Sequence, residues 1–124
     1  MATIITSMRN AMVQAAANSL PSGSSLILYS GTPPTNINTA LSGNTVLATF
    51  TTAGWGAPAT GTITAAAISS VVAAASGTGT FVRVLVSTVP TYQENVGSGV
   101  TIDNTNIVSS GNVNVTSWAL TQPA

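Results

Sequence analysis

The chain carries almost no charge. Arg9, Arg83, Glu94 and Asp103 are its only charged residues, 3% of the sequence, whereas an ordinary soluble domain has about 25%. It contains no lysine, no histidine and no cysteine. Enzymes draw most of their acids, bases and nucleophiles from the residue types that are missing or scarce here. The composition therefore argues against an enzyme and favours a protein that acts through packing contacts.

The missing cysteines also exclude a disulfide framework and a zinc–thiolate site. A formal net charge of +0 provides no attraction to phosphate backbones, so we expect no nucleic-acid partner. No apolar run reaches the ~18 residues that a membrane span requires, so we expect no membrane partner. Residues 1–7 lack the positive charge of a signal peptide, which predicts synthesis in a cytoplasm.

The rest of the composition is that of a folded domain. Hydrophobic residues make up 44% of the 124 residues, so one domain over residues 1–124 with a modest core is expected. A net charge near zero removes the repulsion between copies and promotes association. We therefore expect a homo-oligomer.

An N-terminal helix is predicted over residues 7–20. Thr6 or Ser7 is suited to the N-cap, and Pro21 and Gly23 end the pattern. The predicted apolar face consists of Met8, Met12, Ala15, Ala16 and Leu20, and the predicted polar face is largely Arg9, Asn10, Gln14 and Asn18. Two interpretations remain open: a helix packed on a sheet, or an arm that docks on a neighbouring subunit.

Residues 24–121 have the pattern of a β-rich body. Strands are predicted at 26–29, 46–50, 60–68, 80–87, 100–102, 106–108 and 112–121, with loops at 31–44 and 90–95. Residues 69–79 fit a loop, a strand extension or a helical turn. Short strands separated by turn residues are typical of an antiparallel β-sandwich or small barrel. The predicted class is mainly β (α+β) with one short N-terminal helix.

Two predicted strands carry further information. Residues 80–87 are apolar on both faces, which indicates a central strand. If Arg83 lies on such a strand, Glu94 or Asp103 is its expected partner. Residues 112–121 alternate, which places Val113 on one face of the strand and Trp118 on the other.

No residue pattern indicates a catalytic centre, a metal site or a cofactor site. A glycosidase needs two carboxylates across a sugar, and the only two, Glu94 and Asp103, lie in polar turns of the predicted fold. A calcium ion would have Asp103, Asn104 and Asn106 as ligands, but one carboxylate gives little affinity. We expect no catalytic residue, no metal and no cofactor.

Aromatic residues and the Pro-Pro pair are the best candidates for a partner interface, because aromatic side chains carry much of the energy of protein contacts. Trp118 is expected to pack in the core or on a sheet face. The predicted interface residues are Tyr29, Pro33, Pro34, Trp55 and Tyr92.

The segments taken in order resemble a group of small virion structural proteins of tailed bacteriophages. The resemblance covers most of residues 8–121 and is carried by MRNAMVQA, LILYSGTPPTNINTALSGNTVLATFT, GWGAPATGTITA, GTFVRVLV and NIVSSGNVNVTSWALT. It rests on β texture and turn residues rather than on a chemical signature. The chain departs from the group at residues 69–76, which are more apolar here.

The resemblance implies a non-enzymatic capsid decoration (cement) protein. Such a protein would be made in the host cytoplasm and bind the major capsid protein on the outside of the virion, and a homotrimer would suit three-fold lattice positions. Loops 31–44 and 54–58 are the expected contact surfaces. Two alternatives stay open: a tail, baseplate or fibre-associated protein, and a carbohydrate-binding β-sandwich that stacks sugars on Trp55 and Tyr92.

Overall fold

The computed structural model describes residues 3–121 and is mainly β with one N-terminal helix, as the sequence predicts. Helix α1 spans Thr6–Asn18. The strands that follow in these residues are β1 Ser25–Tyr29, β2 Val46–Thr51, β3 Thr62–Thr64, β4 Val71–Val72, β5 Gly77–Thr78, β6 Phe81–Val86, β7 Val89–Asn95, β8 Val100–Ile102, β9 Asn106–Ile107, β10 Asn112–Val113 and β11 Val115–Thr121.

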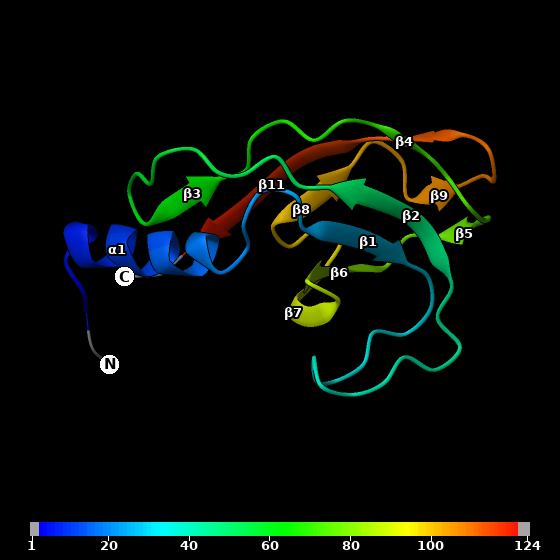
Figure 1. Cartoon of the computed structure of the whole chain (residues 1–124), viewed down its shortest axis with the longest axis horizontal. Coiled ribbons are helices and arrows are strands. Elements are labelled where there is room, and N and C mark those ends of the chain that lie inside the picture. The colour runs from blue at the N-terminus through cyan, green and yellow to red at the C-terminus, as the bar shows by residue number, and fades with distance from the viewer. Residues whose placement is uncertain (1–2, 122–124) are drawn as a thin grey trace.

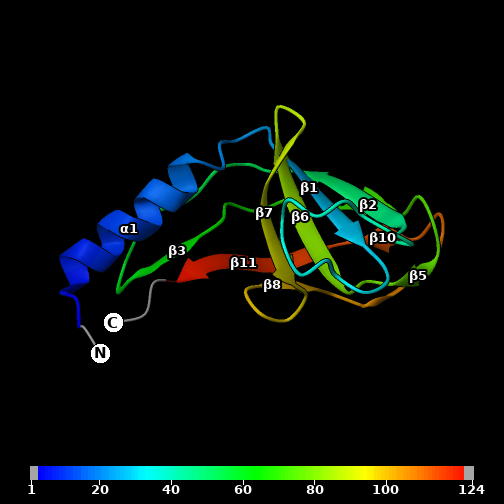
Figure 2. The same cartoon turned by 90° about the horizontal axis from the view of Figure 1, so that it is seen from below.

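Two open sheets make up most of the body. One has the order β2-β1-β6-β7 and the other β3-β11-β8, and two short pairs, β10-β4 and β5-β9, extend them. All pairings between named strands are antiparallel. Figures 1 and 2 show β11 in a different layer from β1 and β6. No sheet closes within residues 3–121, so the barrel alternative is wrong and two layers around one core form instead.

The core lies between the two sheets. Strands β1 and β6 place Leu26 opposite Val84 and Leu28 opposite Val82, and these four side chains are almost fully buried. They belong to one cluster with side chains from the other sheet, among them Ile63, Val100 and Trp118. Strand β6 has neighbours on both sides and is buried on both faces over residues 81–84, which confirms the predicted central strand.

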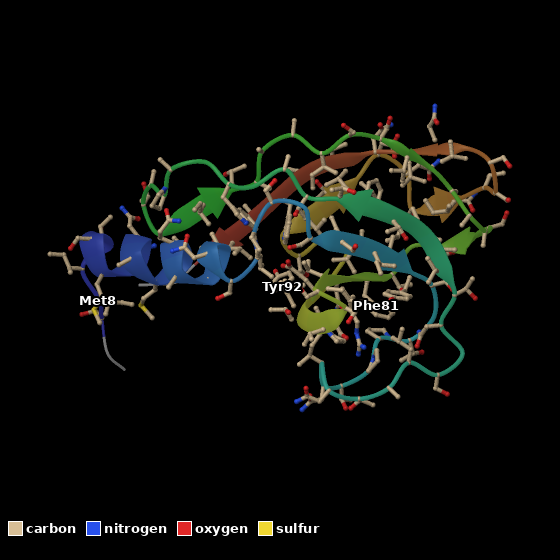
Figure 3. All side chains as sticks on the ribbon, in the orientation of Figure 1. Met8, Phe81 and Tyr92 are labelled. Carbon is tan, nitrogen blue, oxygen red and sulfur yellow. The ribbon has the colours of Figure 1, made fainter. Side chains whose placement is uncertain are left out.

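Loop 31–44 covers the outer face of the first sheet. On that face Tyr29 stacks on Phe81, with ring centroids 5.2 Å apart, and Arg83 is only 4% exposed. Arg83 Nη2 donates to Thr39 O at 3.0 Å, and Gln93 Nε2 donates to Pro34 O at 2.9 Å. Figure 3 shows Phe81 on the side of β6 that faces this loop. The loop is therefore tied to the sheet by side chains of β6 and β7.

The predicted ion pair of Arg83 with Glu94 or Asp103 is wrong. Arg83 Nε donates to Gln93 Oε1 at 2.8 Å, which is the neighbouring side chain across β6 and β7. Glu94 instead accepts from the Tyr92 hydroxyl, and Asp103 accepts from Asn114 Nδ2 at 2.8 Å. Residue 94 follows Gln93 on a strand, so its side chain points to the opposite face from the one that Arg83 occupies.

Helix α1 packs on the body with a different face from the predicted one. Its buried residues are Val13 and Ala17, and two residues of the predicted polar face hold it to the turn before β3. Arg9 Nη2 donates to Thr60 O at 3.1 Å, and Asn10 Oδ1 accepts from Gly61 N at 2.7 Å. The predicted apolar residues Met8 and Met12 are 52% and 40% exposed. The turn at Thr60 and Gly61 presents a backbone carbonyl and a backbone N–H group to the helix, so polar side chains of the helix pack against it.

The N-terminal boundary also differs from the prediction. The residue before the helix is Ile5, which makes no side-chain cap, so neither Thr6 nor Ser7 has the predicted capping role. The predicted end at Leu20 extends two residues beyond the helix, although Leu20 is itself buried, at 3% exposure. Figure 1 shows α1 at one end of the molecule, beside β3.

The predicted loop at 90–95 is wrong, because these residues form most of β7. The β6–β7 connection is Ser87-Thr88, and both residues have positive φ, 50° and 69°, as in the tight turns that suit β-hairpins. Such turns are usually signalled by Asn or Gly, which are absent here. The polar run of β7 does not prevent pairing, because it forms a sheet edge.

Two other stretches are less regular than predicted. Only Thr62–Thr64 of residues 60–68 pairs as a strand, and residues 69–79 contain the two short strands β4 and β5. Strand 112–121 is interrupted at Asn114, and the register shifts between Val115 and Ser117. The bulge brings Val113 and Trp118 both into the core, at 1% exposure each, although strict alternation would separate them.

We predict that Arg83→Met loosens loop 31–44. The substitution keeps an apolar stem but removes the hydrogen bonds that Arg83 donates to Thr39 O and Gln93 Oε1, which costs about 1.5–3 kcal/mol. Urea unfolding should show this loss, and limited proteolysis should show cleavage within 31–44. Arg9→Met is the matched control, since Arg9 binds a different turn, and it should leave the loop protected. Equal protection of loop 31–44 in both variants would contradict the anchoring role.

Candidate functional site

A groove runs between α1, β7 and β11. Its larger part has a volume of about 350 Å³, and an adjoining apolar hollow of about 170 Å³ continues it toward the end of the helix. Both parts are lined by Ala16, Tyr92 and Leu120, so they form one groove. Figure 3 shows Tyr92 between the end of α1 and the first sheet.

An aromatic cluster of Trp55, Tyr92 and Trp118 adjoins the groove. Trp118 is 1% exposed. The centroid of its ring lies 4.4 Å from the ring centroid of Trp55 and 5.9 Å from the ring centroid of Tyr92. Trp55 Nε1 donates to Leu20 O at 3.0 Å. The cluster thus fixes the end of the helix, the loop before β3 and strand β7 relative to one another.

Glu94 lies in the groove on the core side of β7. It is opposite Val82 on β6, and Tyr92 is opposite Val84, and both valines are core residues. The Tyr92 hydroxyl donates to Glu94 Oε2. Burial raises the pKa of the Glu94 carboxyl, against the smaller lowering effect of the Tyr92 hydroxyl. One of the two carboxylates of the chain is therefore partly withdrawn from water.

Burial raises the pKa of Tyr92 as well, and the hydrogen bond to Glu94 and its charge add to the rise. Tyr92 therefore stays a neutral hydrogen-bond donor. The buried indole nitrogen of Trp118 has no hydrogen-bond partner among residues 3–121, although the indole lies close enough to lower the pKa of Tyr92 slightly. The polar side chains that line the groove are thus the Tyr92 hydroxyl, the Glu94 carboxylate and the hydroxyls of Ser98 and Thr121.

Gly99 shapes the wall of the groove beside Glu94. Its φ is +152°, and a Cβ built there would overlap the carboxylate of Glu94. The backbone of Gly99 thus provides the space in which the carboxylate lies. Any side chain at this position would displace it toward solvent.

The interface residues predicted from the sequence occupy three different environments. Tyr29 is 4% exposed and stacks on Phe81 on the outer face of the first sheet, so it is covered within the chain and offers almost no surface. Pro33 and Pro34 are half-buried, and the carbonyl of Pro34 is used to hold the loop. Trp55 and Tyr92 both pack on Trp118. Only Tyr92 of the five lines the groove.

Trp55 and Tyr92 do not form a sugar platform. Both rings are partly buried against Trp118, and the polar edge of Trp55 is occupied by Leu20 O. A stacking platform needs a free aromatic face, so this geometry disfavours the carbohydrate-binding alternative.

The sequence did not identify the groove or the role of Glu94. Treating residues 90–95 as a loop hid the alternation that places Tyr92 and Glu94 on one face. The signal that could have found it is the pattern Tyr-Gln-Glu next to a strongly β-prone segment.

Asp103 and its neighbours show no cation site. Asn104 Oδ1 accepts from Asn106 N at 2.9 Å, so it closes a turn, and Asp103 binds Asn114. The described residues contain no group of three or more His, Cys, Asp or Glu that could hold a metal. None of the helices in the described part is long and apolar enough to cross a membrane.

No protein-family profile, curated protein or solved structure matches this chain.

We predict that stability falls as pH rises from about 4.5 toward neutrality. The folded-state pKa of Glu94 lies above its ordinary 4.5, so its contribution is complete below that pH and is lost as the pH rises through the folded-state pKa. The pKa of Asp103 is lowered from 3.8, chiefly by Asn114, so its contribution is lost only as pH falls below 3.8. Melting temperatures across pH, at constant ionic strength, test this.

Glu94→Gln should flatten the curve above pH 4.5, because the titrating group is gone. Asp103→Asn should keep the slope there and change only the more acidic part. An unchanged slope in Glu94→Gln would contradict the assignment.

Proposed function

We propose that this chain is a non-enzymatic structural protein of a tailed-phage virion that decorates the outer capsid lattice. The observation that supports it most is the apolar outer side of α1. Ile5, Met8 and Met12 are 72%, 52% and 40% exposed, on a helix that reaches the body mainly through β3 and β11. Figure 3 shows Met8 directed away from the rest of the chain.

Exposed apolar side chains gathered on one element are typical of interaction surfaces. The four ionisable side chains offer little alternative: Arg83 is buried and Glu94 lies in the groove. Contacts made by apolar and hydroxyl groups depend little on ionic strength, unlike contacts between exposed charges. Such a surface suits a protein that must stay attached while salt conditions vary.

The proposed mechanism consists of binding contacts alone and involves no chemical reaction. Each copy contacts neighbouring major capsid proteins in a form that exists only in the mature shell, and a ligand that binds only one state stabilises that state. Many weak contacts in a lattice reinforce one another through effective concentration. The resemblance of residues 8–121 to small phage virion proteins agrees with this role, and a trimer would match three-fold positions.

The copy number per virion tests the proposal. Quantitative mass spectrometry of purified particles should give a ratio near one-to-one with the major capsid protein. A handful to a few dozen copies would assign the chain to the tail, baseplate or fibre instead. Absence from the particle would refute a virion role altogether.

We predict that Ile5→Thr combined with Met8→Gln weakens binding to shells about tenfold or more. Burying one large apolar side chain contributes about 1.5–3 kcal/mol, and 1.4 kcal/mol corresponds to a factor of ten. Neither change should disrupt the helix, since Gln resembles Met in helix propensity and Thr is a better N-cap than Ile. Sedimentation of the protein with shells that lack it measures the effect.

Val108→Thr is the matched control. Val108 is 63% exposed, and it follows β9, which Figure 1 shows at the end of the molecule opposite α1. It should bind like the wild type. Equal binding by all three proteins would exclude the helix from the interface.

A further inference from the structure

We infer that the groove between α1, β7 and β11 is a receptor for one lysine or arginine side chain of the partner protein. The inference deepens the proposed function and rests on it only for the source of that side chain. The groove holds Glu94 together with Tyr92, and among residues 3–121 these are the only titratable residues that line it.

The carboxylate of Glu94 is partly withdrawn from water, and neither arginine of the chain serves as its counter-ion. Burial is the main influence on its pKa, and Tyr92 is the other one. Arg83 is bound to Gln93 on the opposite face of β7, and Arg9 donates to Thr60 O in the turn before β3. A cation from outside would therefore recover electrostatic free energy that the isolated chain forgoes.

In the part of the chain that the structure describes, the elements that pack around the groove bring no titratable side chain other than Tyr92 to Glu94. Helix α1 contributes Met12, Val13 and Ala16, and β11 contributes Ala119, Leu120 and Thr121. The connection between β7 and β8 contributes Ser98 and Gly99. Among these residues, Glu94 is therefore the only one that gives the groove a charge.

The walls of the groove fit a long basic side chain better than a free metal ion. Met12, Ala16 and Leu120 give it apolar sides, which suit the methylene stem of lysine or arginine. At the charged end, the Glu94 carboxylate offers a charge-assisted hydrogen bond. One carboxylate is too few for a calcium or magnesium site.

The backbone of Gly99 keeps the carboxylate in the groove. Because a Cβ at this position would overlap the carboxylate of Glu94, the bare backbone leaves the room that the group occupies. Tyr92 holds the other side of the carboxylate through its hydroxyl. The acceptor is therefore oriented before any partner arrives, which lowers the entropy cost of binding.

The test uses n-butylguanidinium as the probe and uncharged n-butylurea as its matched neutral analogue. Each is titrated into the isotope-labelled full chain at pH 7, and NMR follows the Gly99 amide and the Trp118 indole. We expect the cation to bind at least tenfold more tightly than butylurea, with shifts confined to the groove. Binding should weaken as the pH falls and Glu94 takes up a proton.

Glu94→Gln should abolish the preference for the cation. Asp103→Asn removes the same charge from an exposed turn and should preserve it. If the cation and butylurea bind equally to the wild type, or if Glu94→Gln keeps the preference, the proposal is wrong. Glu94 would then be only an inward-pointing charge that discourages pairing at the β7 edge.

A second measurement needs no variant. The carboxyl carbon resonance of Glu94 is titrated with pH in the presence and absence of n-butylguanidinium. By linkage the cation must lower the pKa of Glu94, and an unchanged pKa would refute the receptor. These experiments use the isolated chain, so their result is independent of the copy number that tests the virion role.

Discussion

The burial of Trp118 is the contact on which the rest of the structure depends. Its ring touches Trp55 from the loop before β3 and Tyr92 from β7, so three distant segments meet at one side chain. Trp55 in turn holds Leu20 O at the end of the helix region. Removing this ring would leave a large cavity and release the helix, the edge strand and the second sheet from one another.

The shortage of charged residues also determines which groups make the polar contacts of the fold. Where other proteins use ion pairs, this chain uses side-chain amides and hydroxyls. Gln93 serves the buried Arg83, Asn44 holds the ends of loop 31–44 through Ser30 O and Thr32 O, and Thr101 bridges to Ser117 at the β11 bulge. Contacts in which at least one partner is neutral are screened little by salt, although the buried Arg83 guanidinium still carries the desolvation cost of an ion.

The sequence predicted an element well where a single pattern of hydrophobic residues runs through the whole segment. The largely apolar run of β6 correctly indicated a central strand, because apolar side chains on both faces of a strand indicate burial on both faces. The helix was predicted with the right length and the wrong face, since the choice depended on a turn at Thr60 and Gly61 that lies fifty residues away in sequence. Interactions of that kind leave no trace in a local pattern.

The same limit explains what was missed at the site. Strict alternation separated Val113 from Trp118, and only the bulge in β11 brings both inside. A turn of Ser87 and Thr88 hid the hairpin that makes Tyr92 and Glu94 neighbours across the face of β7. The resemblance to small phage virion proteins implied a role but could not predict the groove, because it rests on the pattern of strand and turn residues rather than on a chemical signature.

Helix α1 connects the two features that support a role in assembly. Its outer side exposes Met8, and Met12 on the next turn borders the groove. A partner surface that covers the outer side of the helix is therefore brought to the mouth of the groove. Apolar contact alone is weakly directional, whereas a single oriented carboxylate defines a position and an angle. Under the proposed function, the combination would let a chain with four charged residues bind its partner in one register.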